Sequence, residues 1–351
     1  MNYPLKSLRY FRVTLCLSIV VLSPASSQAQ TTASPLKGDL RVHDPCMIKA
    51  ADRYYVFSTG KGIRIKTSDD RIHWKNAGRV FTDSTLPAWH TRDIPNQDGN
   101  LWAPEIQFFH GTYYLYYAVS AWMNFHSSIG LATNTTLDPN APGYRWVDRG
   151  QVISYRNGGD GVNVIDPNVF EDTDGMVWLV YGSYKAGLRL TRLNPANGKL
   201  LTNPPHITVL TNGLGEGSFL IKGPHYYYLF VSAGRCCAGL ASTYHVVMGR
   251  ARHVEGPYLD KKGESLLDNK ASLFLTGDYQ EPGRGGASFF TERDTTFIVY
   301  HAYTRSQAGA SLLNIKPVYI DQQGWPTLTP TGRLFHRTDD ASRIGLTRFT
   351  R

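Results

Sequence analysis

The stretch Phe219-Leu-Ile-Lys-Gly-Pro-His-Tyr-Tyr-Tyr-Leu-Phe-Val-Ser-Ala233 decides the fold of this chain. A short apolar run is followed by Lys-Gly-Pro-His and then by a longer aromatic and apolar run. Two runs of this kind, joined by glycine and proline, are typical of a β-hairpin. The stretch therefore predicts two antiparallel strands.

The same hairpin recurs four more times. Longer strand runs start at positions 54, 113, 177, 226 and 297, and each follows a shorter strand and a turn. Further strand-like stretches between the copies bring each unit to about four strands. Five small antiparallel sheets without a long helical period predict an all-β, five-bladed β-propeller. A multi-sheet β protein of another topology is the alternative.

The N-terminal residues read as a targeting signal. Basic residues precede an apolar run over 13–22 and then small residues, which is the order of a secretory signal. We expect cleavage after Ala29, so that 1–29 is a signal peptide and 30–351 a single catalytic propeller domain. The mature protein is then secreted or periplasmic.

The remaining composition excludes several partners. The formal charge of the whole chain is +9, but lysines and arginines are scattered singly, which predicts a solvated surface and no nucleic-acid partner. No later run is apolar for the roughly 20 residues that a membrane helix needs. We therefore expect a monomer with neither a nucleic-acid nor a membrane partner.

The cysteines give no framework. Cys16 leaves with the signal, and Cys46, Cys236 and Cys237 remain. An odd number without a C-x-x-C spacing argues against a disulfide scaffold and against a zinc site. The adjacent Cys236 and Cys237 are either two thiols in a tight turn or, in an oxidising compartment, a vicinal disulfide.

Acidic residues precede the longer strand in four of the five units. The inner strand of a propeller blade lines the central channel, so residues at its start converge on one rim. Asp44, Glu105, Asp166 and Glu216 are thus expected to face one pocket. Each acid alone reads more naturally as a turn residue, and it is their shared place in the repeat that favours a site. The matching positions are His43-Asp44-Pro45, Ala103-Pro104-Glu105, Ile165-Asp166-Pro167, Gly215-Glu216-Gly217 and Gly285-Gly286-Ala287.

Clustered carboxylates suit glycoside hydrolysis. Proximity raises the pKa of some members, so that one carboxyl group stays protonated and donates a proton while another stays ionised and activates water. Aromatic residues in or beside loops near the expected rim are candidates to stack on sugar rings. They are Trp89, Trp102, Trp122, Phe125 and Tyr184.

A set of motifs spread over nearly the whole mature chain carries a family resemblance. It consists of His43-Asp44-Pro45, Leu101-Trp-Ala-Pro-Glu105, Asn163-Val-Ile-Asp-Pro-Asn168, Glu216-Gly217 followed by Tyr226-Tyr-Tyr-Leu-Phe-Val, Arg235-Cys-Cys-Ala-Gly239 with Ser242-Thr-Tyr, Gly256-Pro-Tyr-Leu-Asp260 and Tyr300-His-Ala-Tyr303. With these motifs the chain resembles the family 43 glycoside hydrolases, and within them the endo-1,5-α-L-arabinanases. The resemblance implies a secreted inverting hydrolase that cleaves internal α-1,5-L-arabinofuranosidic bonds of arabinan or arabino-oligosaccharides.

The resemblance also implies residue roles. Asp44 corresponds to the general base, Glu216 to the general acid, and Asp166 to the carboxylate that tunes and orients the acid. His301 corresponds to a histidine beside a Ca²⁺ or Na⁺ ion on the propeller axis; by itself it would read as a hydrogen-bonded core residue. The implied substrate contacts are Asp44, Trp102, Asn163, Val164, Ile165, Asp166, Ser183 and Tyr184.

Three departures leave the mode of cleavage open. Glu105 replaces the aspartate of many relatives, and the stretches 121–127 and 183–185 differ from the usual loop patterns. An exo-acting α-L-arabinofuranosidase or β-xylosidase of the same fold is therefore an alternative. A carbohydrate-binding propeller without catalytic activity is another, although the presence of all three carboxylates argues against it.

Overall fold

The computed structural model describes residues 1, 35–122, 124 and 126–338. From Pro35 onwards the described residues form one compact unit. The signal expected over 1–29 and the rim aromatic Phe125 lie outside the described residues. No helix of the described part is long and apolar enough to cross a membrane.

In the described residues the strands form five sheets of three to five strands that follow one another along the chain, as the repeats predicted, and one two-stranded ribbon. The first contains β2 (Cys46–Ala50), β3 (Arg53–Ser58), β5 (Arg64–Ser68) and β6 (His73–Arg79), with β1 (Lys37–Gly38) parallel to β6. The second contains β7 (Asn100–Phe109), β8 (Thr112–Ser120), β9 (Ser127–Asn134) and β10 (Val147–Ser154), with β4 (Gly60–Lys61) on β7. The third contains β11 (Asn168–Glu171), β12 (Val177–Ser183), β13 (Gly187–Leu193) and β14 (Thr208–Val209).

The fourth sheet contains β15 (Glu216–Lys222), β16 (Tyr227–Ala233), β17 (His245–Ala251) and β18 (Ser272–Leu275). The fifth contains β19 (Gly285–Glu292), β20 (Thr295–Thr304) and β21 (Ala310–Pro317), and a small ribbon joins β22 (Tyr319–Ile320) to β23 (Pro326–Thr327). The helices are short: α1 (Trp89–Asp93) and 3₁₀ turns at Gly239–Ala241, Leu266–Asp268 and Arg305–Gln307.

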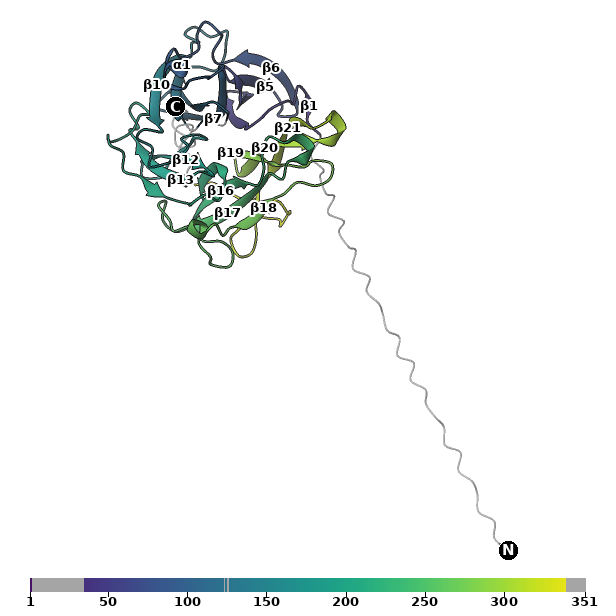
Figure 1. The fold of residues 1–351 in the computed structure, drawn as a ribbon. Helices are drawn as coiled ribbons and strands as arrows, with labels where there is room; N and C mark the ends of the chain where they lie inside the picture. Colours follow the sequence, from purple (N-terminus) through teal and green to yellow (C-terminus); the bar gives the residue numbers. More distant parts are fainter. Residues whose placement is uncertain (2–34, 123, 125, 339–351) are drawn as a thin grey trace, which may run out of the picture. The chain divides into compact units, whose positions relative to one another are not determined.

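The inner strands close a ring. β2 contacts β7, β7 contacts β11, β11 contacts β15, β15 contacts β19, and β19 contacts β2 again. Figure 1 shows the sheets following one another around a common centre. The prediction of an all-β, five-bladed propeller is confirmed.

The hairpin 219–233 shows why its strands are apolar without alternation. Phe219 pairs with Phe230 and Leu220 with Leu229 in antiparallel register. Phe219 and Phe230 belong to a buried cluster shared with the fifth sheet, whereas Leu220 and Leu229 belong to one shared with the third. A sheet covered on both faces needs apolar side chains in both directions, and each blade is held by its two neighbours.

The segment before the first blade completes the fifth. Arg41 forms an antiparallel bridge with Leu312, the Val42 N–H donates to the Ser311 carbonyl oxygen at 3.1 Å, and the Leu313 N–H donates to the Leu40 carbonyl oxygen at 2.8 Å. The start of the described chain is thereby hydrogen-bonded to its last blade, which closes the ring. His43 and Asp44 follow directly, so ring closure also positions the first candidate catalytic residue.

Candidate active site

A left-handed residue marks the start of every inner strand. The backbone φ angles are 46° at Asp44, 39° at Ala103, 55° at Asp166, 52° at Gly217 and 55° at Gly286. In the second, fourth and fifth sheets strand pairing is interrupted at this point, which is the signature of a β-bulge. These five residues are therefore structurally equivalent and turn toward the axis.

Contrary to the prediction from the repeat, the four acids do not all occupy equivalent positions. Asp44 and Asp166 occupy the left-handed position, but Glu216 comes one residue before it and Glu105 two residues after it. The sequence did not predict these offsets, because the position of a β-bulge cannot be read from the spacing of the repeats. Glu105 therefore lies deeper in the channel, only 3% exposed, and accepts hydrogen bonds from Gln107 at 2.7 Å and Asn168 at 3.3 Å.

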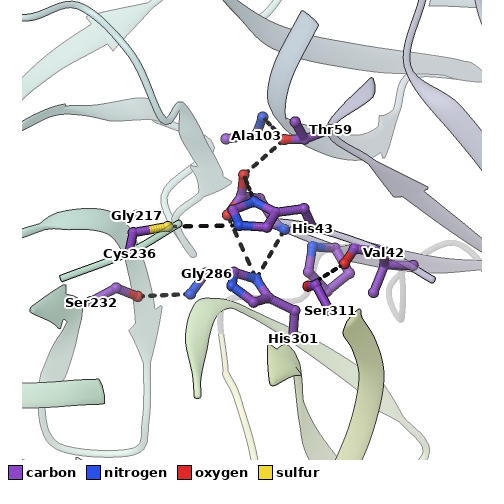
Figure 2. A network of polar contacts seen from close by, with 12 residues as sticks. Val42, His43, Thr59, Ala103, Gly217, Ser232, Cys236, Gly286, His301 and Ser311 are labelled. Atoms are coloured by element: carbon purple, nitrogen blue, oxygen red, sulfur yellow. Dashed lines mark hydrogen bonds and ion pairs between the residues drawn. The ribbon is translucent and has the colours of Figure 1, made fainter. Parts of the chain in front are cut away.

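The backbone N–H groups of four of these five residues tie their blade to the preceding one. Ala103 donates to Thr59 Oγ1 at 2.8 Å, and Gly217 donates to Asp166 Oδ2 at 2.9 Å. Gly286 donates to Ser232 Oγ at 3.1 Å, and Asp44 donates to His301 Nδ1 at 3.2 Å. Figure 2 shows the Thr59, Ser232 and His301 contacts close together around His43.

Asp44 is held as an ionised carboxylate. Its Oδ2 lies 2.8 Å from His43 Nδ1 and accepts a hydrogen bond from Thr59 Oγ1 at 2.7 Å. Burial opposes ionisation, yet the charge and hydrogen bond of His43 bring the pKa of Asp44 well below its usual range. Burial likewise opposes the charged imidazole, but Asp44 raises the pKa of His43 to about 10.

Glu216 has the opposite character. Burial, followed by the negative charge of Asp44, raises the pKa of Glu216 to about 7. The Tyr244 hydroxyl donates to Glu216 Oε1 at 3.2 Å, which limits that rise. Two carboxyl groups of one site thus have their pKa values pushed apart, one toward a proton acceptor and the other toward a proton donor.

Asp166 is the third carboxyl group that interacts electrostatically with Asp44 and Glu216. Burial and the charge of Glu216 raise its pKa well above the usual range. Its Oδ2 accepts the N–H of Gly217, the residue next to Glu216. Asp166 therefore holds the backbone that carries Glu216.

His301 is fully buried beneath the site. Its ring stacks on His43 with 4.0 Å between ring centroids, and its Nδ1 accepts the Asp44 N–H. Burial lowers the pKa of His301, so the ring is neutral and carries its proton on Nε2. Within the described residues, Nε2 has no hydrogen-bond partner.

The expected substrate contacts divide by exposure. Trp102 and Asn163 are partly exposed and Tyr184 is 39% exposed, whereas the side chains of Val164, Ile165 and Ser183 are buried. Val164 packs in the core of the third blade, so its side chain is closed to a ligand.

Among the aromatic candidates, Trp122 is 73% exposed, as a stacking residue requires. Trp89 is not a rim residue: it is 6% exposed and stacks on Tyr117. Trp89 lies on the short helix α1 and not on an open loop, and its side chain packs against the first two blades.

The comparison with protein families agrees with this geometry. The family model described as glycosyl hydrolases family 43 matches residues 38–326. This chain belongs to glycoside hydrolase family 43. The family 43 chain is therefore an enzyme that hydrolyses glycosidic bonds.

Relatives of this family 43 hydrolase act on arabinan. It is 40% identical over 298 residues to an extracellular exo-α-(1→5)-L-arabinofuranosidase of Cellvibrio japonicus, covering 81% of this chain and 85% of that protein. It is 35% identical to an extracellular endo-α-(1→5)-L-arabinanase of Bacillus subtilis, covering 82% and 87%. The solved Cellvibrio cellulosa α-L-arabinanase with arabinohexaose superposes with a TM-score of 0.79 at 36% identity, covering 85% and 99%.

Two site residues of this family 43 hydrolase escaped sequence reasoning. Thr59 and Tyr244 contact the carboxylates directly, but each lies outside the repeat position that drew attention to the acids. Tyr244 ends the motif Ser242-Thr-Tyr, which was the available signal. Nothing local distinguishes Thr59 from an ordinary residue at the end of a strand.

Proposed function

We propose that this family 43 enzyme hydrolyses α-1,5-linked arabinofuranosyl bonds of arabinan with inversion at the anomeric carbon. The observation that carries the proposal is the opposed ionisation of Asp44 and Glu216 in one site. The names of the relatives at 40% and 35% identity supply the substrate class.

Glu216 acts as the general acid in this proposal. Its carboxyl group gives a proton to the leaving glycosidic oxygen. Burial and the negative charge of Asp44 keep that proton bound near neutral pH, and Asp166 holds the neighbouring Gly217 N–H in place. Asp44, ionised beside His43, takes a proton from the water that attacks the anomeric carbon. Water attack on the face opposite the leaving group inverts the configuration.

Product analysis on linear debranched arabinan tests enzyme class and substrate together. We expect soluble arabinose or arabino-oligosaccharides whose first-formed anomer, followed by proton NMR, is opposite to that of the substrate. A retained anomer would exclude the roles given to Asp44 and Glu216. Activity confined to aryl xylosides would favour the β-xylosidase alternative, and polymer binding without products would favour a carbohydrate-binding propeller.

The mode of cleavage has two candidates. The motifs favour internal cleavage, as in the endo-arabinanase relative, whereas the 40% identical relative is named as exo-acting. An early spread of oligosaccharide lengths from linear arabinan would indicate endo action. A single short product from the first minutes onward would indicate exo action.

A cation on the axis is part of the proposal. The axial cavity has a volume of about 30 Å³ and is lined by carboxylates of Asp44, Glu105 and Asp166, so it has room for one ion or water. Among the described residues, His301 is not part of the lining of this cavity, and its Nε2 carries a proton, so it fits contact with Ca²⁺ or Na⁺ through water better than direct ligation. The ion would offset the charge of the clustered carboxylates. Dialysis against a chelator, followed by metal analysis and activity, tests this.

Export completes the proposal. Relatives described as extracellular agree with a cleaved signal over 1–29. Expression of the full chain and N-terminal sequencing of protein outside the cytoplasm should give a start at residue 30. Retention of the uncleaved chain in the cytoplasm would contradict it.

A further inference from the structure

Two neighbouring thiols lie beside the proposed base. Cys236 and Cys237 occupy the turn after β16, and their Sγ atoms are 2.7 Å apart. The turn is closed by its own hydrogen bonds, because the Arg235 N–H donates to Thr243 Oγ1 at 2.9 Å and Ser242 Oγ donates to the Arg235 carbonyl oxygen at 2.7 Å. Cys236 is partly exposed and Cys237 is exposed, so reagents in solution reach both.

A chain of polar contacts links this pair to Asp44. The Cys237 N–H donates to the Tyr303 hydroxyl oxygen at 2.9 Å, and that oxygen lies 3.0 Å from His43 Nε2. His43 Nδ1 in turn lies 2.8 Å from Asp44 Oδ2.

The two sulfur atoms also approach the same imidazole. Their Sγ atoms lie 3.7 Å (Cys236) and 3.8 Å (Cys237) from His43 Nε2, and Figure 2 shows the Cys236 side chain directed at His43. Tyr303, which accepts from Cys237 and from protonated His43, has its own hydroxyl proton free for Cys236 Sγ at 3.8 Å. The oxidation state of the two sulfur atoms therefore affects the contacts of His43.

We propose that Cys236 and Cys237 are a site of reversible oxidation, and that a vicinal disulfide between them fixes Tyr303 and His43 behind Asp44 in the working enzyme. The Cys237 thiolate attacks a small-molecule disulfide and displaces one thiolate. Cys236, losing its proton to solvent, then attacks the Cys237 sulfur and displaces the second. Two electrons pass to the external disulfide, which leaves as two thiols.

The surroundings favour this exchange at Cys237 and not at Cys46. The hydrogen bond from Cys236, opposed by partial burial and assisted by His43, lowers the pKa of Cys237 to about 5, so it is a thiolate at neutral pH. Cys46 is buried, and burial raises its pKa well above the usual value. Cys46 therefore serves as an unreactive thiol in the same chain.

Oxidation changes the partners of His43. In the reduced pair the Cys237 thiolate is a second anionic neighbour of the imidazolium and competes with Asp44 for it. The disulfide is neutral and leaves His43 to Asp44 and Tyr303. We therefore expect the oxidised enzyme to turn over faster; this consequence rests on the proposed function, whereas the pairing of the thiols does not.

Counting thiols tests the pairing without any activity. The purified full-length enzyme is treated with oxidised glutathione or with a phosphine reductant, alkylated in denaturant and weighed by mass spectrometry. We expect two fewer alkylated cysteines after oxidation. The difference should persist in Cys46→Ala and disappear in the double variant Cys236→Ser and Cys237→Ser. Equal alkylation before and after oxidation would overturn the proposal.

Turnover of linear arabinan tests the consequence. Reduction should lower kcat by roughly tenfold, as disturbance of a residue that orients a reacting group does, and oxidation should restore it. The double serine variant, which has neither the thiolate nor the disulfide, should show the same kcat in both conditions. If the disulfide forms but kcat is equal in both states, the positioning role is overturned. If the disulfide forms but arabinan is hydrolysed in neither state, the pairing is supported and the proposed function is refuted.

Discussion

The Cα atom of Gly286 packs closely against the Asp44 carboxylate. A Cβ atom on Gly286 would lie 2.4 Å from Asp44 Oδ1 and 2.8 Å from His301 Nδ1, closer than non-bonded atoms approach. The fifth blade thus carries glycine at the position where the first and third carry aspartate, because the Asp44 carboxylate fills the space that a fifth side chain would need. The missing acid of the fifth repeat is a packing requirement of the site.

Gly286→Ala should therefore displace the Asp44 carboxylate. We expect kcat on arabinan to fall by about a hundredfold, since a shift of about 1 Å in a reacting group costs that much. Gly111→Ala is the matched control: its φ of 74° is also left-handed, but nothing lies within 4 Å of the added Cβ. Equal loss of activity in both variants would point to backbone strain in place of displacement.

Glu216→Ala should separate substrates by their leaving group. Turnover of arabinan should fall by roughly 10³-fold, whereas aryl arabinofuranosides with acidic phenols, which need no proton, should lose far less. Asp44→Asn is the control, because loss of the base should impair both substrates alike. The acid assignment fails if Glu216→Ala affects polymer and aryl substrates equally.

His43→Gln should move the acid limb of the pH profile. The imidazolium lowers the pKa of Asp44, so its removal raises that pKa and the base becomes protonated at a higher pH. The lower limb of kcat/KM should shift upward by at least about one pH unit. Glutamine retains a side chain that can donate to Asp44 Oδ2. An unshifted limb would show that another group sets the ionisation of the base.

Glu105→Gln should alter how stability depends on pH. Burial raises the pKa of Glu105 to about 8, above its ordinary 4.5, so between these values the unfolded chain releases a proton that the folded chain keeps. This carboxyl group should therefore lower the free energy of unfolding as pH rises from 5 to 8, by up to about 1.4 kcal/mol per pH unit. Glutamine should remove this contribution.

Urea unfolding of both proteins at pH 5, 6, 7 and 8 checks the Glu105 prediction. The wild-type free energy should fall more steeply with pH than that of Glu105→Gln, while part of the slope remains because the pKa of Glu216 is also raised. Parallel curves would mean that Glu105 is already ionised in the folded protein.

The local sequence determined the blades. Each hairpin is specified by neighbouring residues: apolar runs of strand length and a turn rich in glycine and polar residues, as in 219–233. Their fivefold repetition then left few arrangements able to cover both faces of every sheet. The acids near the strand starts could be predicted for the same reason, because aligning the repeats places them at corresponding points of each blade.

The tertiary structure decided which side chains meet. Because the left-handed residues of the second and fourth blades are Ala103 and Gly217, Glu105 lies two residues after the position that Asp44 occupies in the first blade, and Glu216 lies one residue before it. The spacing of the residues in the sequence does not reveal these offsets. Ring closure brings Cys236 and Tyr303 to His43, across 193 and 260 residues of chain. Contacts of this range depend on the packing of all five blades, and no local stretch of sequence encodes them.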